Sequence, residues 1–214
     1  MRLIVFDLDH TLIKANSSFR FGSYLYRQKY FSFWNLLASL SDYVRHKWCG
    51  MSLQALHDSS FSRLFKGRPL ADIRTYVSHF LSENLASLLY EPVWQRLKAA
   101  QEAGHRVLIL SSSPDFLVGE IANRLSVDLW KATSYEVSRL GEFSVISQVM
   151  GGEGKARYVS DLAERLSIPL SSVTTYSDSL LDLPLLTIAG EAVCVRPNDA
   201  LKRICKRNGW EIIQ

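Results

Sequence analysis

The sequence predicts an α/β protein with a doubly wound parallel sheet. Two observations favour this fold. Short runs of β-branched and aliphatic residues recur along the chain and end abruptly at polar residues, as buried parallel strands do. Amphipathic helical patterns separate these runs, and strands that alternate with helices are typical of a sheet covered on both faces. The expected strands are residues 2–6, 106–110, 173–176 and 192–195.

Three helices are expected between these strands. The first covers about residues 92–103 and is followed by Gly104, a residue at which helices commonly stop. Apolar residues at helical spacing predict the other two helices, at residues 117–125 and 159–166.

Residues 14–90 break this alternation. Apolar residues at helical spacing predict helices at residues 53–64 and 73–88, with Pro69 near the start of the second, and no run in this segment indicates a strand. The segment holds fifteen of the chain's 24 aromatic residues, enough to build a small core of its own. We therefore expect a helical insertion between the first strand and the rest of the sheet.

The composition is typical of a soluble globular protein, with 47% hydrophobic and 21% charged residues among 214. The N-terminal residues form no export signal, and no stretch approaches the roughly 20 apolar residues that span a bilayer. We therefore expect no membrane partner and a cytoplasmic location. Cys49, Cys194 and Cys205 are odd in number and have no paired or metal-type spacing, which fits a reducing cytosol better than a disulfide scaffold.

The formal charge of +4 is unevenly spread, because residues 14–90 carry +6 and the remainder carries −2. A basic segment beside an acidic one could steer anionic substrates, although solvated helix faces are the simpler explanation. A basic cluster near the C-terminus has no recognition motif beside it, which indicates a solvated helix face and no nucleic-acid partner. Its members are Lys202, Arg203, Lys206 and Arg207.

Polar residues follow the first two strands. Asp7 and Asp9 could converge on one small site, one as nucleophile and the other as proton donor, with Mg²⁺ neutralising their charge. A turn that merely ends the strand is the alternative. Ser111 suits a phosphate oxygen near a helix start, and the alternative is helix capping, which Ser112 or Ser113 could also perform.

Two further motifs lie later in the chain. Lys155 follows several glycines at a helix start, which resembles a phosphate cradle, and a surface lysine is the alternative. It is not part of a Walker A loop, because Ala156 stands where that loop has Ser or Thr. Asp178 and Asp182 follow another strand, where acidic residues bind a metal or favour a helix dipole. All four motifs lie where open α/β sheets bind ligands.

The segments DLDHTL, LILSSSP, GGEGKA and YSDSLLDLPLL, in this order, resemble the four motifs of the haloacid dehalogenase (HAD) superfamily, and the resemblance covers essentially the whole chain. The long helical segment between the first two motifs resembles subclass IB, which contains phosphoserine phosphatase. The resemblance implies a Rossmann-like HAD core domain of residues 1–13 and 91–214. It also implies a helical cap domain of type C1 at residues 14–90.

The same resemblance implies a Mg²⁺-dependent phosphomonoester hydrolase that forms an aspartyl-phosphate. Asp7 would be the nucleophile and a metal ligand. Asp9 would protonate the leaving oxygen and later activate water, and its backbone carbonyl would reach the metal. Asp178 would complete the metal site, with Asp182 ligating or supporting it. The phosphoryl oxygens would be held by Ser111, Ser112 and Lys155.

Two residues depart from the family pattern. His10 stands where members more often have Gly, Ser or Thr, and it could touch the cap or the substrate or be a tolerated loop residue. Asn16 stands where phosphoserine phosphatases have a glutamate that recognises the amino group, which argues against phosphoserine as the substrate.

We expect a small phosphorylated metabolite as the substrate, and a monomer or homodimer. A phosphotransferase that uses the same phospho-aspartate is one alternative. A non-catalytic binding protein on this fold is the other, and the presence of all the expected acidic residues and of Lys155 disfavours it.

Overall fold

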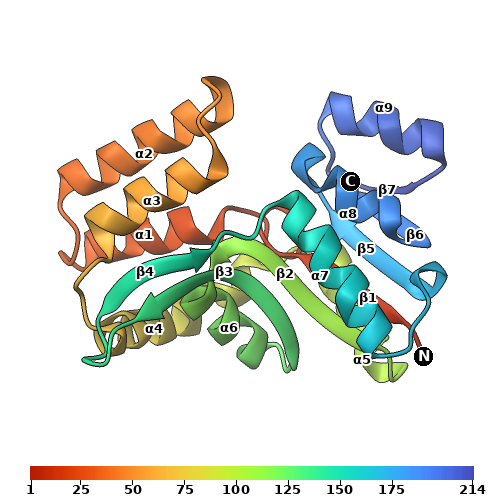
Figure 1. Cartoon of the computed structure of the whole chain (residues 1–214), viewed down its shortest axis with the longest axis horizontal. Coiled ribbons are helices and arrows are strands. Elements are labelled where there is room, and N and C mark those ends of the chain that lie inside the picture. Colours follow the sequence, from red (N-terminus) through yellow and green to blue (C-terminus); the bar gives the residue numbers. More distant parts are fainter.

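The computed structural model describes residues 1–214, apart from the side chain of Lys47. A seven-stranded sheet in the order β4-β3-β2-β1-β5-β6-β7 forms its centre (Figure 1). Every neighbouring pair is parallel except β3 and β4, which are antiparallel. This confirms the doubly wound α/β fold that the sequence predicts. The strands are β1 (Leu3–Asp7), β2 (Arg106–Pro114), β3 (Leu129–Val137), β4 (Phe143–Gln148), β5 (Val173–Ser177), β6 (Glu191–Val195) and β7 (Glu211–Ile213).

Side chains of β1 alternate between the two faces of the sheet. Ile4 and Phe6 belong to one hydrophobic cluster, and Leu3 and Val5 belong to a second. All four are buried because helices cover both faces, and this explains why the strand is an uninterrupted apolar run in the sequence.

Helices from the second half of the chain cover these two faces. Side chains of α5 (Glu91–Glu102) and α6 (Asp115–Arg124) pack in the cluster that contains Phe6. Side chains of α7 (Gly152–Arg165) and α8 (Leu183–Ile188) pack in the cluster that contains Val5. These helices agree with the apolar patterns in the sequence, and Gly104 follows α5 with a positive φ of 69°.

The chain from residue 17 to residue 88 is helical, as expected. It consists of α1 (Ser17–Arg27), α2 (Phe33–Trp48), α3 (Leu53–Leu64) and α4 (Leu70–Leu88). Asn16, Ser32 and Ser52 each cap the helix that follows, since their side chains accept a hydrogen bond from a first-turn N–H. Pro69 directly precedes α4. We call residues 17–88 the helical segment.

The helical segment does not build a core of its own, and that expectation was wrong. Its buried aromatic residues join the cluster that holds Phe6 and continue onto β3 and β4. Phe65, for example, packs its ring against Tyr135 and Phe143, at centroid distances of 5.9 and 5.7 Å. The aromatic residues of the helical segment thus attach it to one end of the sheet.

Three strands were not predicted from the sequence. β3 and β4 form an antiparallel pair at one edge, and exposed positions interrupt the apolar positions along both. β7 has three residues and lies at the opposite edge. The edge strands β4 and β7, and β3 beside the first of them, lack the continuous apolar run that identifies a central parallel strand.

The pairing of two cysteines was also not predicted from the sequence. Cys194 of β6 and Cys205 of α9 (Asp199–Asn208) form a disulfide, while Cys49 is free and exposed. The two bonded cysteines are buried in a small cluster between β6 and α9. Their spacing of 11 residues gave no signal, because the packing of the helix on the strand brings the sulfur atoms together.

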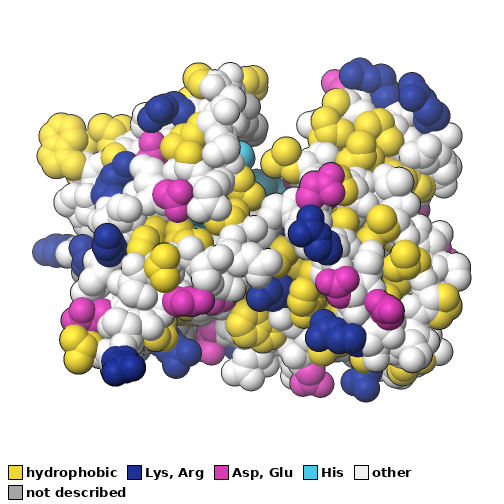
Figure 2. All heavy atoms as spheres, viewed as in Figure 1, with side chains coloured by type: hydrophobic (Ala, Val, Ile, Leu, Met, Phe, Trp, Pro, Cys, Tyr) yellow, Lys and Arg dark blue, Asp and Glu magenta, His cyan; other side chains and the backbone are white. Residues whose placement is uncertain are grey.

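The basic cluster of the C-terminus lies on the outer face of α9, where Arg203, Lys206 and Arg207 are exposed (Figure 2). This agrees with the solvated helix face that the sequence indicates. Among the described residues, no helix combines the length and the apolar character that crossing a membrane requires.

The burial of Phe80 predicts a large stability effect. Its side chain is 1% exposed and contacts the rings of Phe21 and Tyr24 on α1. We expect Phe80→Ala to lower the free energy of unfolding by about 3–5 kcal/mol, since it leaves a cavity at the base of the helical segment. Phe33, which is 54% exposed, is the matched control, and Phe33→Ala should cost about 1 kcal/mol or less in urea unfolding. Equal losses in the two variants would contradict this packing.

Candidate active site

The candidate site lies where the strand order reverses. From β1 the chain proceeds to β2 and β3 on one side and later returns to β5 and β6 on the other. Open α/β sheets bind ligands at the carboxyl ends of the strands at such a point. Asp7 is the last residue of β1, Ser111 lies in the second half of β2, and Ser177 is the last residue of β5. Three of the four sequence motifs therefore meet at this edge.

Lys155 joins the fourth motif to this edge. Its Nζ donates to Oδ1 of Asp7 at 2.6 Å and to Oδ2 of Asp182 at 2.8 Å. The hydroxyl of Ser177 also donates to Oδ2 of Asp182, at 2.8 Å. All four residues are buried, with Lys155 only 2% exposed. This excludes the alternative that Lys155 is an ordinary surface lysine.

The ammonium of Lys155 is stabilised by its carboxylate partners. Burial alone disfavours the charged form of a lysine, but the negative charges of Asp182 and Asp7 outweigh this and raise the pKa of Lys155 above its ordinary value. The amine is therefore a permanent positive charge within the site at neutral pH.

Carboxyl groups nevertheless outnumber ammonium groups here. Burial raises the pKa of Asp7 well above its ordinary value, and Lys155 only partly opposes this. Burial also raises the pKa of Asp178, whose Oδ1 accepts a hydrogen bond from Thr11 at 3.3 Å. Three carboxylates share one ammonium, which is an arrangement that a bound cation would stabilise.

The donor atoms suit a hard cation such as Mg²⁺. Among the described residues, no group of three or more His, Cys, Asp or Glu side chains is arranged to hold a metal ion. Magnesium needs fewer protein ligands, since one or two carboxylates commonly bind it and water fills the remaining positions. The oxygen atoms of Asp7 and Asp178, beside a single ammonium shared with Asp182, fit that requirement.

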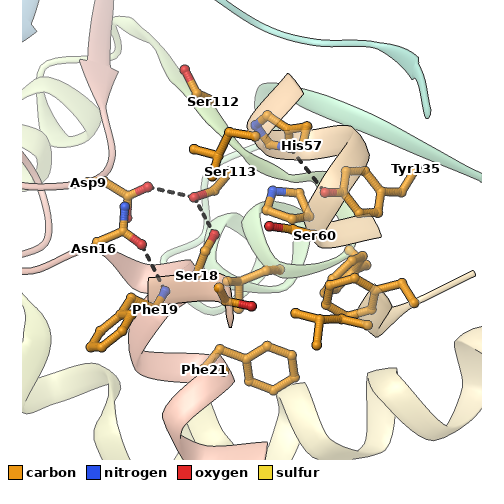
Figure 3. Close-up of a pocket in the computed structure, with 18 of the residues that line it drawn as sticks. Asp9, Asn16, Ser18, Phe19, Phe21, His57, Ser60, Ser112, Ser113 and Tyr135 are labelled. Atoms are coloured by element: carbon orange, nitrogen blue, oxygen red, sulfur yellow. Dashed lines mark hydrogen bonds between the residues drawn. The ribbon is translucent and has the colours of Figure 1, made fainter. Parts of the chain in front are cut away.

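Asp9 lies at the other side of the site, and two hydrogen bonds fix its carboxyl group. The backbone N–H of Ser17 donates to Oδ1 at 2.6 Å. The hydroxyl of Ser113 donates to Oδ2 at 2.6 Å (Figure 3). Ser113 also contacts the hydroxyl of Ser18, with an Oγ–Oγ distance of 2.7 Å. The first turn of α1 and the end of β2 thus hold Asp9 between them.

Sequence reasoning missed these contacts of Asp9. It considered Ser113 only as a residue that could cap a helix, but α6 follows Pro114 and has no side-chain capping hydrogen bond. Ser113 instead donates its hydroxyl to Asp9, and its backbone N–H donates to Oγ of Ser111 at 3.0 Å. Three consecutive serines could have suggested a hydroxyl network, but the sequence does not show which one faces the acid.

The two serines expected to bind phosphate differ in orientation. Ser111 is 1% exposed, and its Oγ accepts the N–H of Ser113 beside the site. The hydroxyl of Ser112 donates to the backbone carbonyl of Met150 at 2.7 Å, so its proton is engaged away from Asp9. The phosphate-binding role of both residues stays a prediction.

The two departures from the family pattern have structural roles. His10 has a positive φ of 60° in the turn after β1, and its carbonyl accepts a hydrogen bond from Arg196 at 2.6 Å. Asn16 caps α1, because its Oδ1 accepts the N–H of Phe19 at 2.8 Å.

A cavity of about 190 Å³ adjoins Asp9, between the helical segment and the carboxyl end of the sheet. Figure 3 shows Asp9, Asn16 and Ser113 at one side of it and His57 and Tyr135 at the other. The protein surface is also hollowed between the helical segment and the part that carries α7 to α9 (Figure 2). Aromatic rings line much of the cavity and come from Phe19, Phe21, Phe31, Phe65, Phe116 and Tyr135.

His57 is the one histidine among the described residues that line this cavity. Its Nδ1 lies 3.0 Å from the hydroxyl of Tyr135. Burial lowers the pKa of His57 to about 4, so the imidazole is neutral at physiological pH.

The comparisons with known proteins agree with this architecture. A sequence model described as haloacid dehalogenase-like hydrolase matches residues 4–187. The chain belongs to this family of hydrolases. This confirms the resemblance that its four motifs suggested.

Similar proteins are named as phosphatases. The chain is 28% identical over 213 residues to "Phosphoserine phosphatase SerB1" of Mycobacterium tuberculosis, covering 97% of this chain and 68% of that protein. It is 27% identical over 221 residues to "Histidinol-phosphatase" of Neisseria meningitidis, covering 99% and 97%. A solved complex of phosphoserine phosphatase with its substrate shares the fold, with a TM-score of 0.74 at 17% identity and coverage of 99% and 92%. The expectation of an enzyme of the phosphatase class is confirmed.

The close packing at Gly152 provides a test of how α7 brings Lys155 to Asp7 and Asp182. A Cβ atom at Gly152 would lie 1.8 Å from the backbone oxygen of Leu181, in the turn that leads to Asp182. We expect Gly152→Ala to force the start of α7 away from this turn, lowering stability by about 1–3 kcal/mol and reducing phosphatase activity.

Gly154 is the matched control in the same helix. A Cβ there meets only the sulfur of Met150 at 3.6 Å, an ordinary contact. Gly154→Ala should therefore keep or raise the melting temperature, because alanine favours a helix over glycine. The two variants are compared by thermal unfolding and by phosphate release. An unaltered Gly152→Ala protein would contradict the close approach.

Proposed function

We propose that this protein is a Mg²⁺-dependent phosphomonoester hydrolase that acts through an aspartyl-phosphate on Asp7. The carrying observation is the buried contact of Lys155 with Asp7 and Asp182 at the carboxyl end of β1, beside a fixed Asp9. The proposal includes a core domain of residues 1–13 and 91–214 and a cap domain of residues 14–90. The substrate is a small phosphorylated metabolite, the class to which the names of the relatives also point.

The first step transfers the phosphoryl group to the protein. A carboxylate oxygen of Asp7 forms a bond to phosphorus as the bond from phosphorus to the alcohol oxygen breaks. Asp9 gives its proton to the departing oxygen, which leaves as a neutral alcohol. Lys155 faces the equatorial oxygens and stabilises their charge, and the hydroxyl of Ser111 assists it. Ser112 assists only after its hydroxyl leaves the carbonyl of Met150, to which it donates at 2.7 Å.

The second step returns the protein to its starting state. Asp9, now a carboxylate, accepts a proton from water as the water oxygen forms a bond to phosphorus. The bond from phosphorus to the Asp7 oxygen breaks, which releases inorganic phosphate and regenerates the carboxylate. One residue serves as acid and then as base, so its carboxyl group must keep the same position in both steps. The hydrogen bonds from Ser17 and Ser113 supply that constraint.

Mg²⁺ would be held by Asp7, Asp178 and the backbone carbonyl of Asp9, and it would neutralise charge on the phosphoryl group. Asp182 would support the site through Lys155, since its Oδ2 already accepts two hydrogen bonds.

The nucleophile is tested with Asp7→Asn. Without a carboxylate oxygen to attack phosphorus, we expect phosphate release from p-nitrophenyl phosphate with Mg²⁺ to fall by at least about a thousandfold. Asp161→Asn, which removes an exposed carboxylate on α7, is the control and should retain full activity.

Acid quenching and borohydride reduction of the wild-type protein during turnover should modify residue 7. Removal of the metal with a chelator should stop turnover, and Mg²⁺ should restore it. Robust activity in purified Asp7→Asn would refute the mechanism.

The role of Ser113 is tested by the leaving group. If Ser113 holds Asp9 for proton donation, Ser113→Ala should lower kcat about tenfold for benzyl phosphate, whose alkoxide must be protonated as it leaves. The loss should be much smaller for p-nitrophenyl phosphate, because its phenolate leaves without a proton. Ser23→Ala removes an exposed hydroxyl of α1 and should change neither rate. Equal losses on both esters would show that Ser113 is needed for something other than the acid.

A further inference from the structure

We propose that the cavity beside Asp9 selects phosphate esters whose alcohol is uncharged and has a compact apolar body, about the size of one aromatic ring. This rests on the proposed function, because the cavity is assigned to the leaving alcohol that Asp9 protonates. It goes further in naming the chemical class of that alcohol. Four properties of the cavity carry the inference.

The first property is its wall. Aromatic and aliphatic side chains from α1, α2, α3 and α6 surround the space. The aliphatic ones include Leu36, Leu53 and Leu56. Removing an apolar alcohol from water into such a wall is favourable by roughly 25 cal/mol for each Å² of apolar surface.

The second property is its charge. Of the described residues that line the cavity, Asp9 is the one with a formally charged side chain. Its carboxyl oxygens already accept hydrogen bonds from Ser17 and Ser113, and the chemistry requires it to exchange a proton. His57 is neutral, since burial lowers its pKa to about 4. Because Asp9 is protonated when it acts as the acid of the first step, an ammonium or a carboxylate on the alcohol would then be desolvated without an opposite charge, which is strongly unfavourable.

The third property is the orientation of Asn16. Its Oδ1 accepts the N–H of Phe19, and the amide is neutral, so Asn16 gives an ammonium in the cavity no opposite charge. The polar groups that remain are neutral, among them Asn35, Ser39, Ser60 and the His57–Tyr135 pair. These can hydrogen-bond a hydroxyl or a carbonyl on the alcohol, but they do not compensate a full charge.

The fourth property is size. A cavity of about 150 Å³ in another protein holds benzene, and this one measures about 190 Å³. A single ring with a short polar substituent fills such a space, and a long acyl chain exceeds it. Phosphoserine and histidinol phosphate both carry an ammonium group, so both belong to the disfavoured class although relatives are named for them.

The test compares esters that differ in one property. Benzyl phosphate and 4-(aminomethyl)benzyl phosphate have similar leaving oxygens but differ by one ammonium, and n-dodecyl phosphate tests length. We expect kcat/KM for benzyl phosphate to exceed that for the aminomethyl ester, and for phosphoserine, by about 100-fold. Dodecyl phosphate should also be poorer than benzyl phosphate.

A pair of variants tests whether the cavity causes the preference. Ser60 lines the cavity from α3, and Ser62 is exposed on the same helix. Ser60→Asp should lower the preference for benzyl over aminomethylbenzyl phosphate at least tenfold, by giving the ammonium a partner. Ser62→Asp introduces the same charge outside and should leave the ratio unchanged.

The outcomes separate this inference from the proposed function. Acetyl phosphate and p-nitrophenyl phosphate serve as general probes of activity, and if neither is hydrolysed the proposed function fails and the inference fails with it. If they are hydrolysed but phosphoserine or the aminomethyl ester matches benzyl phosphate, the inference alone is overturned. A preference for dodecyl phosphate, or an equal shift in both serine variants, would also overturn it.

Discussion

The buried ammonium of Lys155 is the interaction on which the site depends. Lys155 lies on α7, and its ammonium joins Asp7 at the end of β1 to Asp182 in the turn after β5. A buried charge pair costs desolvation energy, and removing one partner leaves an uncompensated charge that destabilises a protein by several kcal/mol. The contact is therefore weak evidence for stability as such. In the mechanism that we propose, its value lies in a fixed positive charge beside the phosphoryl group.

The contacts of Lys155 with Asp7 and Asp182 require α7 to lie close to the turn that contains Asp182. Lys155 can reach both carboxylates because Gly152 lets the helix start against the backbone of Leu181. Gly152 therefore has a packing role, in addition to the likeness of this motif to a phosphate cradle. The sequence showed the residue types, and the packing shows why a side chain is excluded at one of them.

The predictable and unpredictable parts of the structure differ in burial. Central strands such as β1 and β5 are buried on both faces, so their continuous apolar runs identify them directly. The edge strand β4 and its neighbour β3 are partly exposed and gave no such signal. The disulfide of Cys194 and Cys205 escaped prediction for a related reason, since it depends on how a helix packs on a strand and not on spacing.

The same distinction applies within the site. Asp7, Lys155 and Asp182 could be identified because each belongs to a motif of fixed order, and the fold brings them together. Ser113 and Ser17 could not, because their contacts with Asp9 depend on α1 packing against the end of β2. That packing in turn follows from the shared aromatic core, which attaches the helical segment to the sheet.

The shared aromatic core also decides what the site can accept. A cap domain with a separate hydrophobic core could present any surface to the substrate, because the residues that face the substrate would not be needed to attach it. In this protein the residues that attach the helical segment, including Phe65 and Tyr135, also line the cavity beside Asp9. Replacing them with charged residues that recognise an amino acid would weaken the attachment itself. The apolar character of the cavity is therefore a consequence of how the helical segment is held, and selectivity and stability are coupled at the same side chains.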